Sequence, residues 1–238
     1  MPASPPESGR QIVIAGQAVA YRLRRSARRT IGLTIDHAGL RVGAPQRARI
    51  ADIEALLREH GDWVLAKLDA WKKRPAPEML AVADGLAISA FGRPLTVRIA
   101  AASRAGGRIA GDTLHLAVPP AVDAASVLEK TLREHARRVF AERLALHAPR
   151  LGVPVPPLRL SSARTRWGSC SSRGGIALNW RLVFLPLPVV DYVVCHELAH
   201  LKEMNHSPRF WSVVEQLCPD WQALRVELRR RGRDLPRF

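Results

Sequence analysis

A short stretch near the C-terminal end of the chain has the residue types of a metal-dependent hydrolase. His196, Glu197 and His200 follow the pattern H-E-x-x-H, and a further histidine, His206, lies six residues on. At about 3.6 residues per turn, the first two histidines project from one face of a helix, so both imidazoles can bind one ion. Glu197 is next to His196, where a general base must sit to take a proton from metal-bound water.

The third histidine can join this site only if the helix breaks before it. On an unbroken helix, His206 would point roughly 120° away from His200. Asn205 tolerates the left-handed conformation common at helix ends. Ser207 and Pro208 have the residue types of an N-cap and a first helical residue. The sequence therefore predicts a tight corner that turns His206 back toward one zinc ion per chain, with a fourth position left open.

The composition indicates a globular chain. Its 238 residues are 47% hydrophobic, which allows one large domain or two modest ones. No apolar run approaches the ~20 residues of a membrane span, so no membrane association is expected. Residues 1–10 lack the apolar core of a signal peptide and are predicted to form a disordered tail. We therefore expect the protein in the cytoplasm.

The number of cysteines and the net charge indicate which classes of protein and of binding partner to expect. An odd, sparse set of cysteines, Cys170, Cys195 and Cys218, argues against a disulfide framework. The net charge of +16 favours polyanions as partners, either nucleotides or nucleic acid. An early strand end is crowded with arginines, which we interpret as a solvated edge that discourages aggregation; a phosphate-contacting patch is the alternative. They are Arg22, Arg24, Arg25, Arg28 and Arg29.

Residues 11–120 are predicted to form an N-terminal β-rich α+β region. Alternating apolar residues and turn signals predict short strands at 11–14, 18–23, 31–35, 40–42, 87–90, 95–99, 108–110 and 113–117. One helix is predicted over 50–73, with a bend at Gly61. Residues 74–77 read as a linker.

Residues 121–238 are predicted to form the zinc metallopeptidase catalytic domain. Asp123 is the expected N-cap of a long helix over 124–147. Strands are expected at 158–161 and 176–180, and helices from Pro188 through the metal-binding stretch, over 208–217 and over 221–231. The hairpin that precedes the metal-binding helix suggests an edge strand beside a cleft, with which an extended substrate could pair.

Taken together, these motifs resemble the YgjP-like metallopeptidase family. The residues that carry the resemblance are Arg166-Trp167-Gly168-Ser169-Cys170, Leu178-Asn179, Asp191-Tyr192-Val193-Val194, His196-Glu197-Leu198-Ala199-His200, and Asn205-His206-Ser207 with Phe210-Trp211 and Pro219-Asp220. The resemblance implies an α+β, zincin-like fold of the gluzincin kind, with the HExxH helix beside a small mixed or antiparallel sheet. It also implies that His196, His200 and His206 bind zinc and that Glu197 is the base. The spacing matches the metzincin signature too, but Glu203 stands where those enzymes have a glycine.

Zinc-dependent cleavage of a peptide or protein substrate is the first hypothesis. Arg166 is a candidate for stabilising the oxyanion or a substrate carboxylate, because its planar fork suits either; a salt bridge that holds the hairpin is the alternative. Asn179 could hydrogen-bond the substrate backbone or tie its strand to the metal helix.

Three other functions are considered. A metal-dependent nucleotide or phosphoanhydride hydrolase would explain the basic charge, although no P-loop or acidic two-metal cluster is visible. A DNA-associated repair protease, like the SprT-like and WLM proteases, would bind DNA in a salt-sensitive way. A non-enzymatic, zinc-stabilised module would have no use for Glu197.

Overall fold

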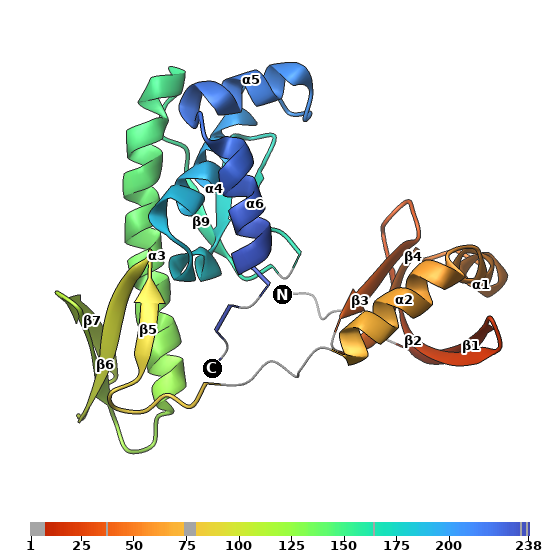
Figure 1. Ribbon diagram of the computed structural model, residues 1–238, viewed down its shortest axis with the longest axis horizontal. Helices are drawn as coiled ribbons and strands as arrows, with labels where there is room; N and C mark the ends of the chain where they lie inside the picture. Colours follow the sequence, from red (N-terminus) through yellow and green to blue (C-terminus); the bar gives the residue numbers. More distant parts are fainter. Residues whose placement is uncertain (1–7, 37, 74–79, 164, 234, 237) are drawn as a thin grey trace. The chain divides into compact units, whose positions relative to one another are not determined.

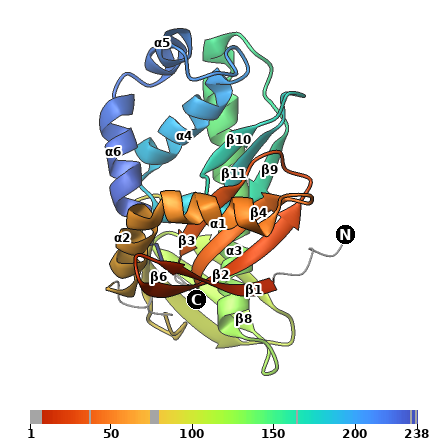
Figure 2. The same cartoon turned by 90° about the vertical axis from the view of Figure 1, so that its right-hand side faces the viewer.

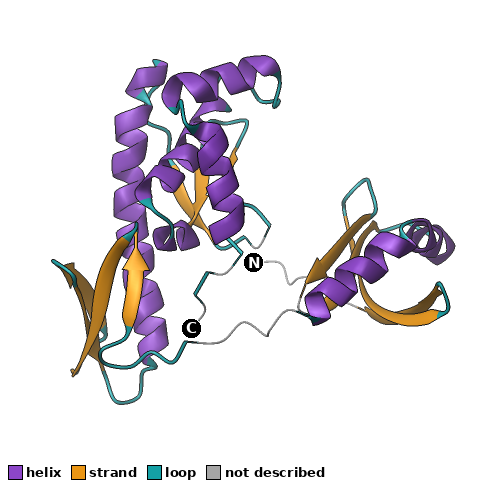
Figure 3. Cartoon of the chain, in the orientation of Figure 1, coloured by secondary structure: helices purple, strands orange, loops and turns teal. Residues whose placement is uncertain are grey.

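The computed structural model describes residues 8–36, 38–73, 80–163, 165–233, 235–236 and 238. The chain forms two compact units, residues 1–78 and 79–238, and each combines helices with strands (Figure 3). The α+β class predicted from the sequence is therefore confirmed. Within the described residues, none of the helices combines the length and the apolar character needed to cross a membrane.

The N-terminal unit is a four-stranded sheet with two helices packed on it (Figure 1). The strands lie in the order β1 (Ser8–Ile14), β2 (Gln17–Ser26), β4 (Gly39–Pro45) and β3 (Gly32–Asp36). β2 is parallel to β4, and the other pairs are antiparallel. Of the predicted tail, residues 8–10 belong to β1, and residues 1–7 lie outside the described part.

Two helices cover this sheet where one was predicted. α1 (Ile50–Glu59) and α2 (Gly61–Lys72) meet at His60. A Cβ at Gly61 would lie 2.7 Å from Cγ2 of Ile14, so glycine allows the helix start to approach β1 closely. The bend expected at Gly61 is thus a break between two helices. The linker predicted at residues 74–77 falls outside the described residues.

Several of the early arginines bind the backbone of their own unit. Arg25 donates from Nη1 to the carbonyl of Pro45, the last residue of β4, and to those of Gln46 and Ala48 just after it, at 2.7–3.2 Å. Arg22 donates to the carbonyl of Ala38 at 2.8 Å. The guanidinium of Arg28 lies against Gly32 and Gly43. These contacts give the three side chains a role in holding the sheet.

The C-terminal unit begins with a second four-stranded sheet that packs against the long helix α3 (Ala124–His147). Its order is β5 (Ala87–Ala90), β6 (Arg93–Ala101), β8 (Thr113–Val118) and β7 (Gly106–Ala110). Asp123 accepts hydrogen bonds from the backbone N–H groups of Ala125 and Ser126, which confirms the predicted N-cap.

One hydrophobic core runs from this sheet through α3 to the helix that carries His196. The boundary between the two compact units falls between residues 78 and 79 of the sequence. The boundary predicted from the sequence falls instead between residues 120 and 121. That division remains a prediction about where a catalytic domain begins.

A three-stranded sheet lies beside the helix that carries His196. Its order is β10 (Gly168–Cys170), β11 (Ile176–Asn179) and β9 (Leu158–Ser161), with β10 antiparallel and β9 parallel to β11. Trp180 begins the short 3-10 helix η2 (Trp180–Phe184), where strand was expected, because Asn179 accepts a hydrogen bond from the N–H of Arg181 and caps it.

Three further helices complete the C-terminal unit: α4 (Leu187–Ala199), α5 (Pro208–Leu217) and α6 (Trp221–Arg231). α4 lies between α6 and the strands β10 and β11 (Figure 2), and it also packs against α3. Elements far apart in the sequence therefore surround the helix that carries His196 and Glu197.

Candidate metal centre

The first two histidines come from the C-terminal end of α4. The helix has Pro188 in its first turn, as predicted, and a largely buried apolar body. His196 lies in its last turn and His200 is its C-cap. Their ring centroids are 5.0 Å apart, as the spacing of four residues on one helix face predicts.

The corner after α4 returns His206 to the other two imidazoles. The Ser207 N–H donates to the carbonyl of Asn205 at 2.8 Å, so His206 is the centre of a three-residue turn. Ser207 then caps α5 by accepting from the Phe210 N–H, as predicted. Asn205 does not have the expected left-handed conformation, because the tight turn reverses the chain without it.

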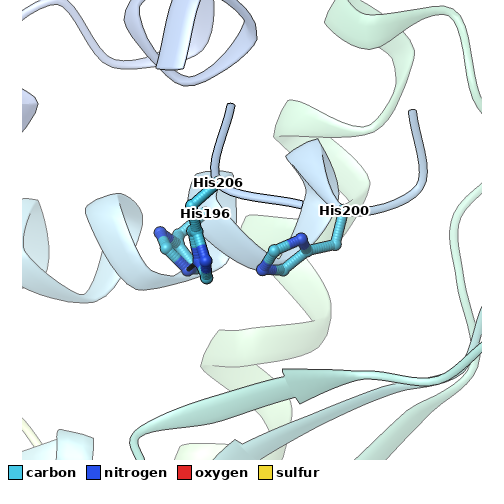
Figure 4. Close-up of side chains that lie close together, drawn as sticks. All are labelled: His196, His200 and His206. Carbon is cyan, nitrogen blue, oxygen red and sulfur yellow. Dashed lines mark hydrogen bonds between the residues drawn. The ribbon is translucent and has the colours of Figure 1, made fainter. Parts of the chain in front are cut away.

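The three imidazoles converge on one point (Figure 4). Nε2 of His206 lies 3.1 Å from Nε2 of His196. Nδ1 of His200 lies 3.1 Å from the carbonyl of Glu203, which leaves Nε2 of that ring for a ligand. One nitrogen from each ring lies within 4.8 Å of the others. We call these three residues the histidine cluster.

The cluster has the donors and spacing that a divalent ion requires. Tetrahedral zinc with Zn–N bonds of about 2.0–2.1 Å places its nitrogen ligands about 3.4 Å apart, close to the shortest separation seen here. Three neutral imidazole nitrogens suit zinc and its neighbours in the transition series. The residues present therefore fit a metal ion with three protein ligands.

Aromatic rings from α5 support the cluster. The Phe210 ring centroid lies 4.5–4.9 Å from each of the three imidazoles. Trp211 lies 5.8 Å from both His196 and His206, and on another side it stacks on Trp221 of α6 at 4.2 Å. This apolar support restricts the ring orientations and excludes water from one side of the site.

The surroundings favour the neutral form of two of the imidazoles, those of His196 and His206. Burial, with smaller contributions from the neighbouring His200, His206 and Arg225, lowers the pKa of His196 to about 3. The pKa of His206 is lowered by burial, by His200 and by Arg225. A neutral imidazole has the free lone pair that metal ligation needs.

Glu197 is a buried carboxyl group beside this cluster. It is only 5% exposed, and no described group donates a hydrogen bond to its Oε2. Burial raises its pKa to about 7, while the charge of Arg166 acts in the opposite direction. A carboxylate with a pKa near neutrality can both accept and return a proton at physiological pH.

Asn179 holds the loop that carries Arg166. Its Nδ2 donates to the carbonyls of Ala163 at 2.7 Å and Arg166 at 3.3 Å, and its Oδ1 accepts from the Arg181 N–H at 3.1 Å. The residue is 3% exposed. This is an internal, structural use of the amide; substrate contact by Asn179 stays a prediction. Arg166 itself is exposed and close enough to Glu197 for its charge to act there.

The edge strand β10 has backbone groups that point away from the sheet. Hydrogen bonds to the β11 side come from positions 167 and 171, through the Trp167 carbonyl (2.7 Å) and the Ser171 N–H (2.9 Å). In an antiparallel pair, alternate residues bond to the partner strand. The N–H and C=O groups of Gly168 and Cys170 therefore face the open edge, next to Glu197.

Sequence reasoning missed two supports of this site. Arg225 of α6 lies over the Trp211 ring at 5.0 Å, a contact that its place in an arginine-rich helix does not indicate. Asp191 of α4 is bound by Arg143 of α3, an ion pair that no local pattern indicates. Both contacts depend on how helices pack, which the sequence spacing does not encode.

A known family of metallopeptidases matches most of the chain. A family model described as YgjP-like, metallopeptidase domain, matches residues 29–231, which include the cluster, Glu197 and the hairpin. The crystal structure of the metallopeptidase zymogen of Pyrococcus abyssi abylysin is similar at 27% sequence identity, over 42% of this chain and 99% of that one, with a TM-score of 0.36. No curated protein matches the chain.

Proposed function

From the premise that the chain belongs to the YgjP-like metallopeptidase family, we propose that it is a zinc-dependent peptidase that hydrolyses peptide bonds. The observation that carries the proposal is the convergence of His196, His200 and His206 beside the buried carboxyl group of Glu197. A histidine cluster alone would serve a structural ion equally well. The adjacent base is what a hydrolase needs.

His196, His200 and His206 would hold the ion through the nitrogens that face one another. When bound, a divalent ion supplies Lewis acidity, which acidifies water and polarises a carbonyl group. Glu203 contributes by holding Nδ1 of His200 with its carbonyl, so that the ring presents Nε2.

Glu197 moves the proton in this proposal. As a carboxylate it accepts a proton from the attacking water, and it then delivers that proton to the nitrogen of the leaving amine. Its pKa of about 7 makes both transfers feasible near neutrality. Because the side chain is buried, bulk water competes little for the proton.

The hairpin would align the substrate. An extended peptide can pair with the outward N–H and C=O groups of Gly168 and Cys170, as in strand addition to a sheet edge. Arg166 enters from the loop before β10, and its guanidinium would donate to the developing oxyanion or to a substrate carboxylate.

A parallel substrate screen tests the proposal. Zinc-loaded protein is assayed for cleavage of casein-derived peptides and for phosphate or pyrophosphate release from nucleoside triphosphates, each with and without a chelator. We expect chelator-sensitive peptide cleavage and no release from nucleotides. Release from nucleotides without peptide cleavage would instead assign a phosphoanhydride hydrolase. Cleavage that requires added DNA would assign a DNA-associated protease.

A further inference from the structure

The backbone of the edge strand β10 lies so close to Glu197, the proposed base, that a side chain at Gly168 would not fit between them. A Cβ built on Gly168, the first residue of β10, would lie 2.4 Å from Oε1 of Glu197. It would also lie 2.6 Å from both Cδ and Cγ of that side chain. Favourable contacts between carbon atoms begin at about 3.5 Å. Any residue other than glycine at position 168 therefore requires the strand or the glutamate to move.

Rotation of the carboxylate alone cannot relieve this conflict. The last torsion of Glu197 moves its oxygens but leaves Cγ where it is, and Cγ is itself too close. On a helix, only a few side-chain rotamers keep Cγ clear of the preceding turn. The residue is also buried on α4, so space for another rotamer is limited.

We propose that Gly168 is a positioning residue, whose missing side chain lets the edge strand lie directly on Glu197 and holds that carboxylate beside the histidine cluster. The inference rests on the proposed role of Glu197 as the base. In this arrangement one residue serves two requirements. The outward backbone groups of Gly168 can pair with an extended substrate. The space that a side chain would fill at position 168 holds the carboxylate of Glu197, which acts on that substrate.

Another glycine of the same hairpin provides a matched control. A Cβ on Gly175 would meet Oγ of Ser171 at 3.4 Å and the Pro157 carbonyl at 3.9 Å, which are ordinary contacts. Gly175 lies at the turn before β11 and touches none of the proposed site residues in these contacts. Replacing either glycine by alanine adds the same methyl group to the same hairpin.

The kinetic test compares Gly168→Ala with Gly175→Ala on a cleaved peptide, after the zinc content of each is measured. We expect Gly168→Ala to keep its zinc and its KM and to lose about 100-fold in kcat, the cost of a misplaced catalytic group. Gly175→Ala should retain both constants. A wild-type kcat in Gly168→Ala, or an equal loss in both variants, would overturn the proposal.

A thermal stability cycle tests the contact without using activity. Gly168→Ala is measured in the wild-type background and in a Glu197→Ala background, where Cγ, Cδ and the oxygens are gone. We expect the Tm loss caused by Gly168→Ala to be largely abolished in the second background. Equal losses in both backgrounds overturn the proposal. If Gly168→Ala fails to fold, recovery of folding in the double variant supports it and failure in both backgrounds overturns it.

These two tests separate the inference from the proposed function. If the wild-type protein cleaves no peptide, the peptidase assignment fails, yet the stability cycle still reports whether Gly168 and Glu197 share the space. If the wild-type cleaves peptides and Gly168→Ala is equally active, the peptidase assignment stands and the positioning role is excluded.

Discussion

Arg143 of α3 donates two hydrogen bonds to Asp191 of α4, from Nε to Oδ1 at 2.5 Å and from Nη2 to Oδ2 at 2.7 Å. Nε2 of His147 lies 3.4 Å from the same Oδ1. Asp191 precedes His196 on the same helix. This two-bond ion pair therefore fixes α4, the helix that carries His196, against α3.

Replacement of Asp191 tests that support. Asp191→Asn leaves Arg143 half-buried without its carboxylate, so we expect the free energy of unfolding to fall by about 3 kcal/mol. Urea denaturation measures it. Asp112→Asn, which removes an exposed pair with Arg93 at 3.7 Å, should cost less than about 1 kcal/mol. Equal costs for the two variants would contradict a structural role for the Asp191 pair.

The same pair predicts a pH dependence. Burial raises the pKa of Asp191, but hydrogen bonds from His147 and Arg143 and their charges outweigh it and hold the pKa below 3.8. A lowered folded-state pKa stabilises the fold above the unfolded-state pKa, and this contribution disappears as the pH falls through the folded-state value. The stability difference between wild type and Asp191→Asn should be constant above about pH 5 and shrink below about pH 4. A difference that grows on acidification would contradict the lowered pKa.

Arg166 should set the acid limb of the activity profile. Its charge lowers the pKa of Glu197, so Arg166→Met should raise that pKa and move the loss of kcat/KM on the acid side to higher pH. Arg166→Lys keeps the charge and should keep the limb. If the guanidinium also binds the oxyanion, both variants should lose about 10- to 100-fold in kcat/KM. An acid limb that is the same in all three proteins would exclude the electrostatic role.

The open edge of β10 predicts that a backbone N–H takes part in substrate binding. Cys170→Pro removes an N–H that points away from β11, and proline is tolerated at such an edge position. Relative to Cys170→Ala, which loses the same thiol, we expect kcat/KM to fall about fivefold, the effect of one hydrogen bond of about 1 kcal/mol. Peptide cleavage rates at low substrate concentration measure it, and equal rates in the two variants would argue against strand pairing at this edge.

The role of Glu197 predicts a separation between metal binding and turnover. Glu197→Gln has nearly the same shape but cannot accept a proton. We expect it to bind zinc as the wild type does and to lose at least ~100-fold in kcat. Metal analysis and peptide assays on one preparation test this, and a fully active, metal-loaded variant would refute the assignment of the base.

Local chemistry made much of this structure predictable. Asp123 and Ser207 have the short polar side chains that cap helices, and both accept hydrogen bonds from the first turn of the following helix. The H-E-x-x-H spacing correctly placed His196 and His200 on one helix face. Together with the corner before Pro208, these signals were enough to predict that His206 lies with the other two.

Contacts between segments that are distant in the sequence could not be predicted from local sequence patterns. Arg143 and Asp191 are 48 residues apart, and no periodicity links them. The parallel pairing of β9 with β11 depends on how the chain between them folds. The close approach of Gly168 to Glu197 arises from the packing of β10 on α4. A glycine in a hairpin usually indicates a turn, so the presence of a glycine at position 168 did not by itself indicate this contact.

Zinc affinity of a His206→Ala variant tests the central claim most directly. The claim is that an imidazole from the corner completes a site begun on α4, since Nε2 of His206 lies 3.1 Å from Nε2 of His196. Competition with a zinc chelator, with His115→Ala of β8 as control, should give one tightly bound ion per chain in wild type and control and an affinity at least ~100-fold weaker in His206→Ala. Wild-type affinity in His206→Ala would contradict the three-histidine centre.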